Sequence, residues 1–254
     1  MNTHRLRSGL VWLLGVYAAW ESAAWLLVAL HDPMAAVKLP YLHDVVGTFA
    51  AHAGDLIEAA SVTFVQAAFG FVLGAAVGYA LAAVMSASRT AERIAYPYLI
   101  LSQMIPVLGL APIIFNLVRD MDVSRIVIAA YITFFPVAAS TLSGFRAAPA
   151  DARQLMHSYA AKKPTLYLRL LVPFSLPYLF AGLKIAAPLS VTASILVDML
   201  GSKNGIGVKL IYALYGGQSD VFWAAVLTSA VLGIVSYLVI AAAEAVLVPW
   251  RKPV

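Results

Sequence analysis

The chain has 254 residues, of which 62% are hydrophobic and 11% are charged, and its formal net charge is +5 at pH 7. So few polar side chains cannot cover a water-soluble globule of this size, and the absence of cysteine excludes disulfides, thiolate metal sites and a cysteine nucleophile. The composition predicts an all-α, polytopic membrane protein, a single domain over residues 1–254 with no room for a large soluble domain.

Apolar stretches of about 20 residues, the length that spans a bilayer, recur from end to end. They predict six transmembrane helices: Gly9 to Leu30, Ser61 to Ala87, Tyr98 to Val118, Ile126 to Phe145, Pro177 to Leu200, and Phe222 to Val248. The first stretch is too long for the core of a signal peptide and carries Glu21 in its middle. We therefore interpret it as an uncleaved first span.

The basic residues divide unevenly between the two sets of loops. The side that holds both termini carries Arg5, Arg7, Arg89, Arg93, Arg146, Arg153, Lys162, Lys163, Arg169, Arg251 and Lys252, whereas the other side carries Lys38, Arg119, Arg125, Lys203 and Lys209. Because basic residues of short loops are retained in the cytoplasm, both termini are predicted to be cytoplasmic. The charge therefore marks topology and does not indicate nucleic-acid binding. Lys184 is expected to snorkel from the inner end of the fifth span.

The sequence before the third span predicts an amphipathic helix outside the membrane and a close helix contact within it. The external segment His31 to Ala60 carries Val45, Val46, Phe49 and Leu56 at roughly helical spacing, which predicts an interfacial amphipathic helix. In the second span, Gly70, Gly74 and Gly78 recur every four residues and so share one helical face. A face without side chains predicts close approach of another helix.

Prolines interrupt the third, fourth and fifth spans: Pro97, Pro106, Pro112, Pro136, Pro177 and Pro188. An internal proline frees a backbone carbonyl, which membranes tolerate where neighbouring helices or a wet cavity satisfy it. These spans are therefore predicted to be the mechanically active part, with a translocation path or gate formed by Gln103, Pro106, Ser140, Ser190, Ser194 and Asp198. Asp198 ends the fifth span and is a candidate gate or contact for an external partner.

The internal loop from Arg146 to Leu176 is richer in apolar residues than a solvated loop requires. A short helix is predicted from Asp151 to Ala161, and a second helical stretch from Pro164 to near Pro173. The apolar side chains are those of Leu155, Met156, Tyr159, Leu166 and Tyr167. They predict docking into the groove of a partner protein.

This loop resembles the coupling segment of binding-protein-dependent ABC importer permeases, in which EAA, three residues and Gly precede, nine residues later, I/V-x-L-P. The pattern falls on Gln154, Leu155, Met156, Ala160, Leu170, Val172 and Pro173, and Asp151 supplies a nearby acidic residue. Stretches at Gln103 to Phe115, Phe134 to Arg146, Leu176 to Ala187 and Gly201 to Gly207 are similar to the sulfonate, taurine, nitrate and thiamine-precursor branch. The resemblance runs from about Leu39 to Arg251.

The resemblance implies a type I importer fold in the bacterial inner membrane. It implies a homodimer of permease subunits, two cytoplasmic ATPase subunits, and a periplasmic or lipid-anchored solute-binding protein. The ATPase-coupling loop would comprise Asp151, Gln154, Leu155, Met156, Tyr159, Ala160 and Pro173. The cargo would be a small polar nutrient of the sulfonate, taurine, nitrate, thiamine-precursor pyrimidine or riboflavin type.

Several kinds of chemistry have no motif in the sequence. The phosphate-binding pattern G-x-x-x-x-G-K-[ST], the zinc pattern H-E-x-x-H and the nucleophile elbow G-x-S-x-G are all missing. We therefore expect no enzymatic activity, no metal and no cofactor in this chain, with ATP and Mg bound by the partner ATPase. The alternative is a stand-alone secondary transporter or channel, which needs an ion-coupling residue in mid-membrane, and Glu21 is the candidate.

Overall fold

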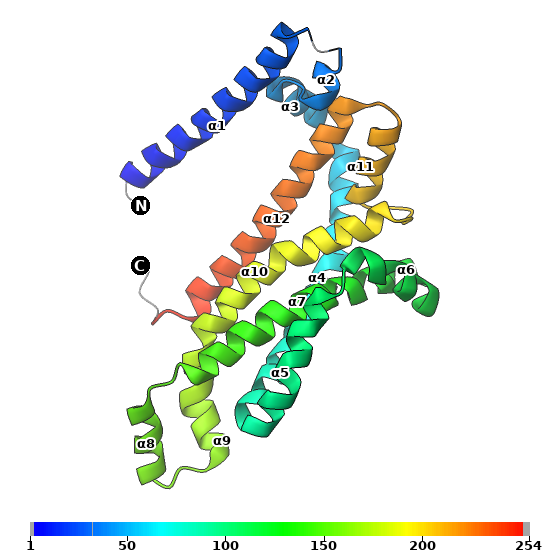
Figure 1. The fold of residues 1–254 in the computed structure, drawn as a ribbon. Helices are drawn as coiled ribbons and strands as arrows, with labels where there is room; N and C mark the ends of the chain where they lie inside the picture. The colour runs from blue at the N-terminus through cyan, green and yellow to red at the C-terminus, as the bar shows by residue number, and fades with distance from the viewer. Residues whose placement is uncertain (1–2, 32, 251–254) are drawn as a thin grey trace.

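The computed structural model describes residues 3–31 and 33–250, and these residues form helices and no strand. In chain order the elements are α1 (Thr3–Ala29), α2 (Ala35–Lys38), α3 (Leu42–Ala51), α4 (Ala53–Ala87), α5 (Arg89–Met104), α6 (Val107–Val118), α7 (Met121–Arg146), α8 (Ala150–Ser158), α9 (Lys163–Leu166), the π-helix η1 (Tyr167–Leu171), α10 (Val172–Met199), α11 (Ile206–Tyr215) and α12 (Ser219–Leu247). The all-helical fold is confirmed (Figure 1). Arg251 and Lys252, two of the predicted topology markers, lie outside the described residues.

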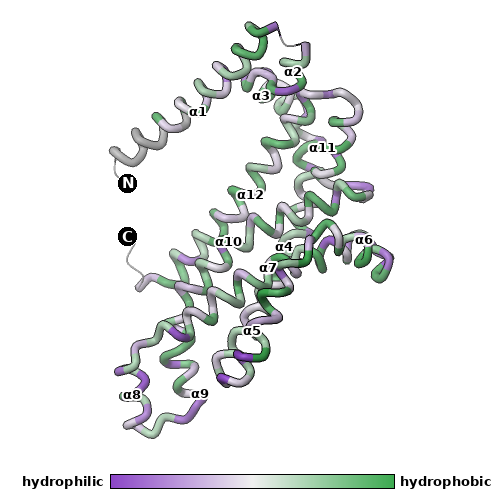
Figure 2. Tube along the Cα trace, in the orientation of Figure 1, coloured by the Kyte–Doolittle hydropathy of each residue, from purple (hydrophilic) through white to green (hydrophobic). Residues whose placement is uncertain are grey.

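The apolar stretches fall on the long helices. Four helical segments are long and apolar enough to cross a membrane: α4, α7, the run Lys163–Met199 that includes α10, and α12. The pair α5 and α6 passes the same test as one bent unit, and α1 carries a shorter apolar stretch, Leu14–Ala29. Hydrophilic residues gather instead at α8 and α9 (Figure 2).

The third predicted span, Tyr98 to Val118, is broken into two helices. The axes of α5 and α6 meet at 96°. Pro106 caps the start of α6, and Ile105 before it is extended at φ −79° and ψ 120°, the conformation that a following proline favours. Pro97 and Pro112, by contrast, lie inside α5 and α6.

The helical stretch predicted to end near Pro173 does not end there. It continues through η1 into α10, so the fifth span begins at Lys163 rather than at Pro177. Pro173 comes directly after the π-helical turn and has no N–H to donate to the preceding turn of the continuous helix. The π-helical turn before it absorbs the change in hydrogen-bond register.

The centre of the fold consists of α4, α7 and α10, which pack against one another, while α12 packs along α10. One apolar core, around Met85, Phe145 and Leu171, lies toward α8. Another, around Val45 and Leu56, joins α3, α4, α11 and α12 at the opposite end (Figure 1). The molecule therefore has two distinct ends, joined by the long helices.

The first helix stands apart from this centre. Figure 1 shows α1 beside α12 but separated from it along most of its length, with α2 and α3 at the end where the two converge. There the ring of Trp20 packs edge-on against Trp223 of α12, with 5.2 Å between centroids, and its indole N–H donates to the Pro40 carbonyl at 2.9 Å. The predicted amphipathic segment is divided: Val45, Val46 and Phe49 lie on α3, whereas Leu56 belongs to the start of α4, and Val45 and Leu56 are buried in the core at this end.

Candidate functional site

The short helix α8 presents two different faces. Leu155 is 56% exposed and Tyr159 is 77% exposed, and Asp151 and Gln154 are exposed with them. Met156 is half-buried and packs against the core that contains Phe145. The structure therefore divides the predicted coupling residues into an outward group and the inward Met156.

The end of α8 has the geometry of a Schellman motif. The Ala161 N–H donates to the Met156 carbonyl at 3.0 Å, and the Ala160 N–H donates to the His157 carbonyl at 2.9 Å. Ala160 has φ +49°, a left-handed conformation that favours glycine. This is the position at which the permease pattern has a glycine, so the chain keeps the turn geometry without the residue that suits it best.

Three contacts connect α8 and the following turn to the long helices. The Arg153 guanidinium donates to the Phe145 carbonyl at the end of α7, at 2.5 Å. The hydroxyls of Tyr167, in η1, and Ser86, near the end of α4, are 2.9 Å apart and hydrogen-bonded. The ring of Tyr167 also meets that of Phe145, with centroids 6.1 Å apart. A force on α8 can therefore reach α4 and α7 through short paths.

The predicted glycine face lies against α7. A Cβ atom on Gly70 would be 2.5 Å from the Ala129 Cβ, one on Gly74 would be 2.5 Å from the Ala130 carbonyl oxygen, and one on Gly78 would be 2.5 Å from the Phe134 carbonyl oxygen. All three distances are far below van der Waals contact. The backbones of α4 and α7 can approach this closely because these positions have no side chain.

The six residues predicted for the path or gate fall into separate groups. Gln103 and Pro106 are exposed at the break between α5 and α6, and Ser140 packs against Gly182 of α10. Ser190, Ser194 and Asp198 lie on one buried face of α10, with exposures of 2%, 0% and 1%. The structure does not bring the six together in one cavity.

Asp198 is part of a buried polar cluster. Its Oδ1 lies 3.1 Å from Nε of Arg125, which is 2% exposed, and its Oδ2 accepts from the Thr63 hydroxyl at 2.5 Å. The cluster joins α4, α7 and α10, whereas the sequence placed Arg125 in an external loop. Arg125 and Thr63 are functional candidates that sequence reasoning missed, because nothing in the sequence pairs residues so far apart.

A polar pocket of about 230 Å³ adjoins this cluster, on the side of the loop between α10 and α11. It is lined by Asp55, Glu58, Ala59, Val62, Lys203, Asn204, Gly205, Val208, Lys209 and Tyr212. Carboxylates from the first turns of α4 face lysines from the loop and α11, and Lys209 Nζ lies 4.0 Å from Asp55 Oδ2. The pocket can therefore receive polar groups of either charge.

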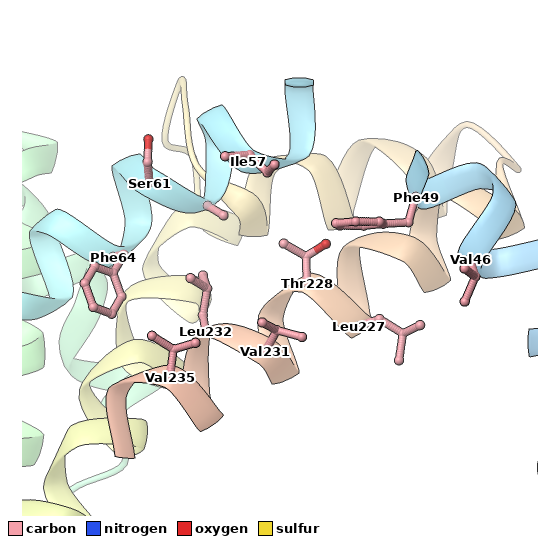
Figure 3. A pocket seen from close by; sticks show the side chains of 11 residues that line it. Val46, Phe49, Ile57, Ser61, Phe64, Leu227, Thr228, Val231, Leu232 and Val235 are labelled. Carbon is pink, nitrogen blue, oxygen red and sulfur yellow. The ribbon is translucent and has the colours of Figure 1, made fainter. Parts of the chain in front are cut away.

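A larger groove of about 450 Å³ has a different character (Figure 3). It lies between α3, α4 and α12 and is lined by apolar side chains such as Phe49, Phe64 and Val231. Its two hydroxyls donate within their own helices, Ser61 to the Glu58 carbonyl and Thr228 to the Ala224 carbonyl. This groove suits hydrocarbon rather than a polar solute.

Glu21, Lys184 and Glu244, three further ionisable residues of the apolar helices, are each paired. Glu21 accepts from the backbone N–H of His43 at 3.2 Å and lies 3.1 Å from its ring Nδ1. Lys184 donates to Glu244 at 2.6 Å, which links α10 to α12. Glu21 belongs to the contact of α1 with α3, away from the central helices, which does not favour an ion-coupling role. Within the described residues, no group of three or more His, Asp or Glu could hold a metal ion.

Comparison with known proteins adds independent evidence. Residues 57–247 match the family described as binding-protein-dependent transport system inner membrane component. The chain is 31% identical over 203 residues to a formylaminopyrimidine transport permease protein of Halalkalibacterium halodurans, covering 78% of this chain and 81% of that one. It is 24% identical over 232 residues to a putative aliphatic sulfonates transport permease protein of Bacillus subtilis, covering 91% and 84%.

The fold has a counterpart among solved structures. A chain of an amino acid ABC transporter, crystallised with histidines, superposes with a TM-score of 0.64 at 13% identity. The match covers 80% of this chain and 97% of the other. At that identity the likeness concerns the fold alone.

Proposed function

The chain belongs to the binding-protein-dependent transport system inner membrane components and is a permease subunit of an ABC importer, and from this premise we propose that it forms a homodimer through which a small polar nutrient crosses the inner membrane. ATP and Mg are bound by two cytoplasmic ATPase subunits. A periplasmic or lipid-anchored binding protein delivers the solute.

The observation that carries the coupling role is the outward face of α8. Leu155 and Tyr159 are large apolar side chains at 56% and 77% exposure. They lie on a helix at a hydrophilic end of the molecule (Figure 2), flanked in the sequence by Arg146, Lys162 and Lys163. Exposed anchors of this kind on one helix face suit a hydrophobic groove in a partner. We place this end, with both termini, in the cytoplasm, because most of the basic loop residues belong to it.

The broken helix pair supports the homodimer. Its surface combines apolar residues, among them Met104 at 70% and Leu117 at 82% exposure, with the exposed polar side chains of Gln103 and Asn116. Amide groups facing hydrocarbon are costly, so such a surface favours cover by protein or by a wet path. A second copy of α5 and α6 would cover the apolar side chains with protein, and a wet path between the two copies would solvate the amides.

The proposed cargo is a small polar nutrient of the thiamine-precursor pyrimidine, riboflavin, sulfonate, taurine or nitrate type. The pyrimidine class is the first to test, because the relative named for formylaminopyrimidine transport matches 78% of the chain at 31% identity. The groove of Figure 3 is unsuited to such a solute, since its lining is apolar. Selectivity for the solute is therefore expected to reside in the binding protein and in the residues between the two permease copies.

Co-purification tests the proposal. The tagged full chain is extracted from its native membrane, and its companions are identified by mass spectrometry, with the mass of the complex giving the number of permease copies. We expect two copies of this chain with an ABC ATPase. A monomer that transports solute in proteoliposomes without any ATPase would refute the proposal and favour a secondary transporter. Thermal shift of the co-purifying binding protein against the five solute classes identifies the cargo.

A further inference from the structure

The loop between α10 and α11, Gly201 to Gly205, is held from beneath by a buried ion pair. Asp198 and Arg125 are 1% and 2% exposed, and their charges meet at 3.1 Å. Charged groups are rarely buried unless they are paired and hydrogen-bonded, because desolvation costs several kcal/mol per ion. Three of the five other residues that this pair contacts, Ser202, Asn204 and Gly207, lie in the loop or at the start of α11.

Arg125 holds the loop itself. Its Nη2 donates to the Asn204 carbonyl at 2.9 Å, and its Nε also donates to the Ser202 hydroxyl at 3.3 Å. Its Nη1 lies 3.6 Å from Asp122, one turn earlier on α7. A single guanidinium therefore binds α7 to two residues of the loop.

Asp198 and Thr63 hold the start of α11. The Thr63 hydroxyl donates to Asp198 Oδ2 at 2.5 Å and accepts from the Ile206 N–H at 2.9 Å. The Gly207 N–H points at the same carboxylate oxygen, 3.4 Å away. The first N–H groups of a helix need acceptors from outside the helix, and here α4 and α10 provide them.

The loop fits this cluster closely. Gly205 has φ +127°, a conformation reserved for glycine, and a Cβ there would overlap the Asp198 carboxylate. A Cβ on Gly207 would be 2.6 Å from the Asp198 Cβ. The sequence Gly205 to Gly207 thus allows the backbone to lie directly on the buried carboxylate.

The opposite face of the same segment forms a wall of the polar pocket. Lys203, Asn204, Gly205, Val208 and Lys209 line that pocket together with the start of α4. We infer that Arg125 is a positioning residue, which with Asp198 and Thr63 locks this pocket wall to α4, α7 and α10. A contact made in the pocket from outside is then transmitted to three spanning helices, and this last step rests on the proposed function.

Site-specific labelling tests the lock without any transport assay. The chain has no cysteine, so a single Val208→Cys reports on the wall alone; Val208 lines the pocket and is 6% exposed. The full chain is placed in nanodiscs of phosphatidylcholine and phosphatidylglycerol, and its reaction with a charged maleimide is timed. We expect slow labelling in the Val208→Cys chain and about tenfold faster labelling when Arg125→Met is added, because the pocket wall then needs less free energy to open locally.

Two controls separate release of the wall from general unfolding. Lys184→Met breaks a different inter-helix ion pair, between α10 and α12, and is expected to leave the Val208→Cys rate unchanged. Ala82→Cys, a fully buried reporter in the core near α8, is expected to stay unreactive in every variant.

The double change Arg125→Met with Asp198→Leu keeps the test decisive if the single variant folds poorly. It leaves no unpaired buried charge, so stability should recover, while the donors to Ser202 and Asn204 are still missing. We expect fast Val208→Cys labelling in this variant too. If Val208→Cys reacts as slowly in the Arg125→Met variants as in the parent, or if Ala82→Cys is accelerated equally, the inference is overturned. Failure to find an ABC ATPase bound to the chain would refute the proposed function but leave this inference standing.

Discussion

The hydroxyl of Tyr167 is hydrogen-bonded to that of Ser86 across 2.9 Å, which joins the π-helical turn after α9 to the last turns of α4. This is a direct bond between the segment that follows α8 and a membrane-spanning helix. It suggests that η1 transmits movement of α8, since single π-helical turns often occur at functional sites.

Tyr167→Phe is expected to lower the free energy of unfolding by about 1 kcal/mol, because it removes one side-chain hydrogen bond and keeps the ring packing. Thermal unfolding in detergent measures the change. Tyr159→Phe is the matched control, since Tyr159 is 77% exposed, and it should unfold like the parent. Equal behaviour of the two variants would show that the bond to Ser86 adds nothing.

The two faces of α8 predict different effects of added charge. Tyr159→Asp should abolish association with the ATPase and leave thermal stability unchanged, because the side chain faces outward. Met156→Glu should instead lower stability by about 2–4 kcal/mol, since Met156 packs against the chain's own core. Pull-down of the ATPase and thermal unfolding, measured on both variants, distinguish them. Normal ATPase binding by Tyr159→Asp would refute the docking assignment.

Ala160→Gly is expected to stabilise the protein by up to about 1 kcal/mol, because Ala160 has φ +49° and glycine adopts this conformation without strain. Ala152→Gly, inside α8, should have the opposite sign by about 1 kcal/mol. Denaturant or thermal unfolding measures both. A loss of stability in Ala160→Gly would mean that the methyl group contributes a packing contact.

Gly74→Ala is expected to destabilise the bundle by about 1–3 kcal/mol, since the added methyl would lie 2.5 Å from the Ala130 carbonyl oxygen. Gly233→Ala is the matched control in another apolar helix, where the nearest atom is the Pro188 Cβ at 3.9 Å. The control should be neutral or slightly stabilising. The melting temperature in detergent compares the two, and equal values would contradict close packing of α4 on α7.

The sequence predicted the helical fold and the long helices well, because hydropathy acts over about 20 residues and needs no knowledge of partners. It could not say which proline breaks the third span. Pro97, Pro106 and Pro112 look alike in the sequence, yet the chain turns only at Pro106, where α6 leaves α5 to pack on α7. The position of the break is therefore set by the packing of α6 on α7, which the sequence alone does not show.

The candidate site was harder to predict for a related reason. The sequence predicts Asp198 as a candidate gate or partner-contact residue, but its partners Arg125 and Thr63 lie on α7 and α4, far away in the sequence. The positive-inside rule places Arg125 in an external loop exposed to water, whereas the structure buries its side chain. A buried ion pair depends on which helices are neighbours, and hydropathy does not contain that information.

The contact of Trp20 with Trp223 also has a consequence for biosynthesis. The ribosome makes Trp20 203 residues before Trp223 (223 − 20), so the two rings can meet only after the intervening helices have been synthesised. At about 5–20 residues per second, the first helix waits roughly 10–40 seconds in the membrane for this partner. Its contacts with Pro40 and His43 form within the first fifth of the chain and can hold the helix near its final position meanwhile. The contact between α1 and α12 therefore forms only after the other membrane-spanning helices that precede α12 have been made.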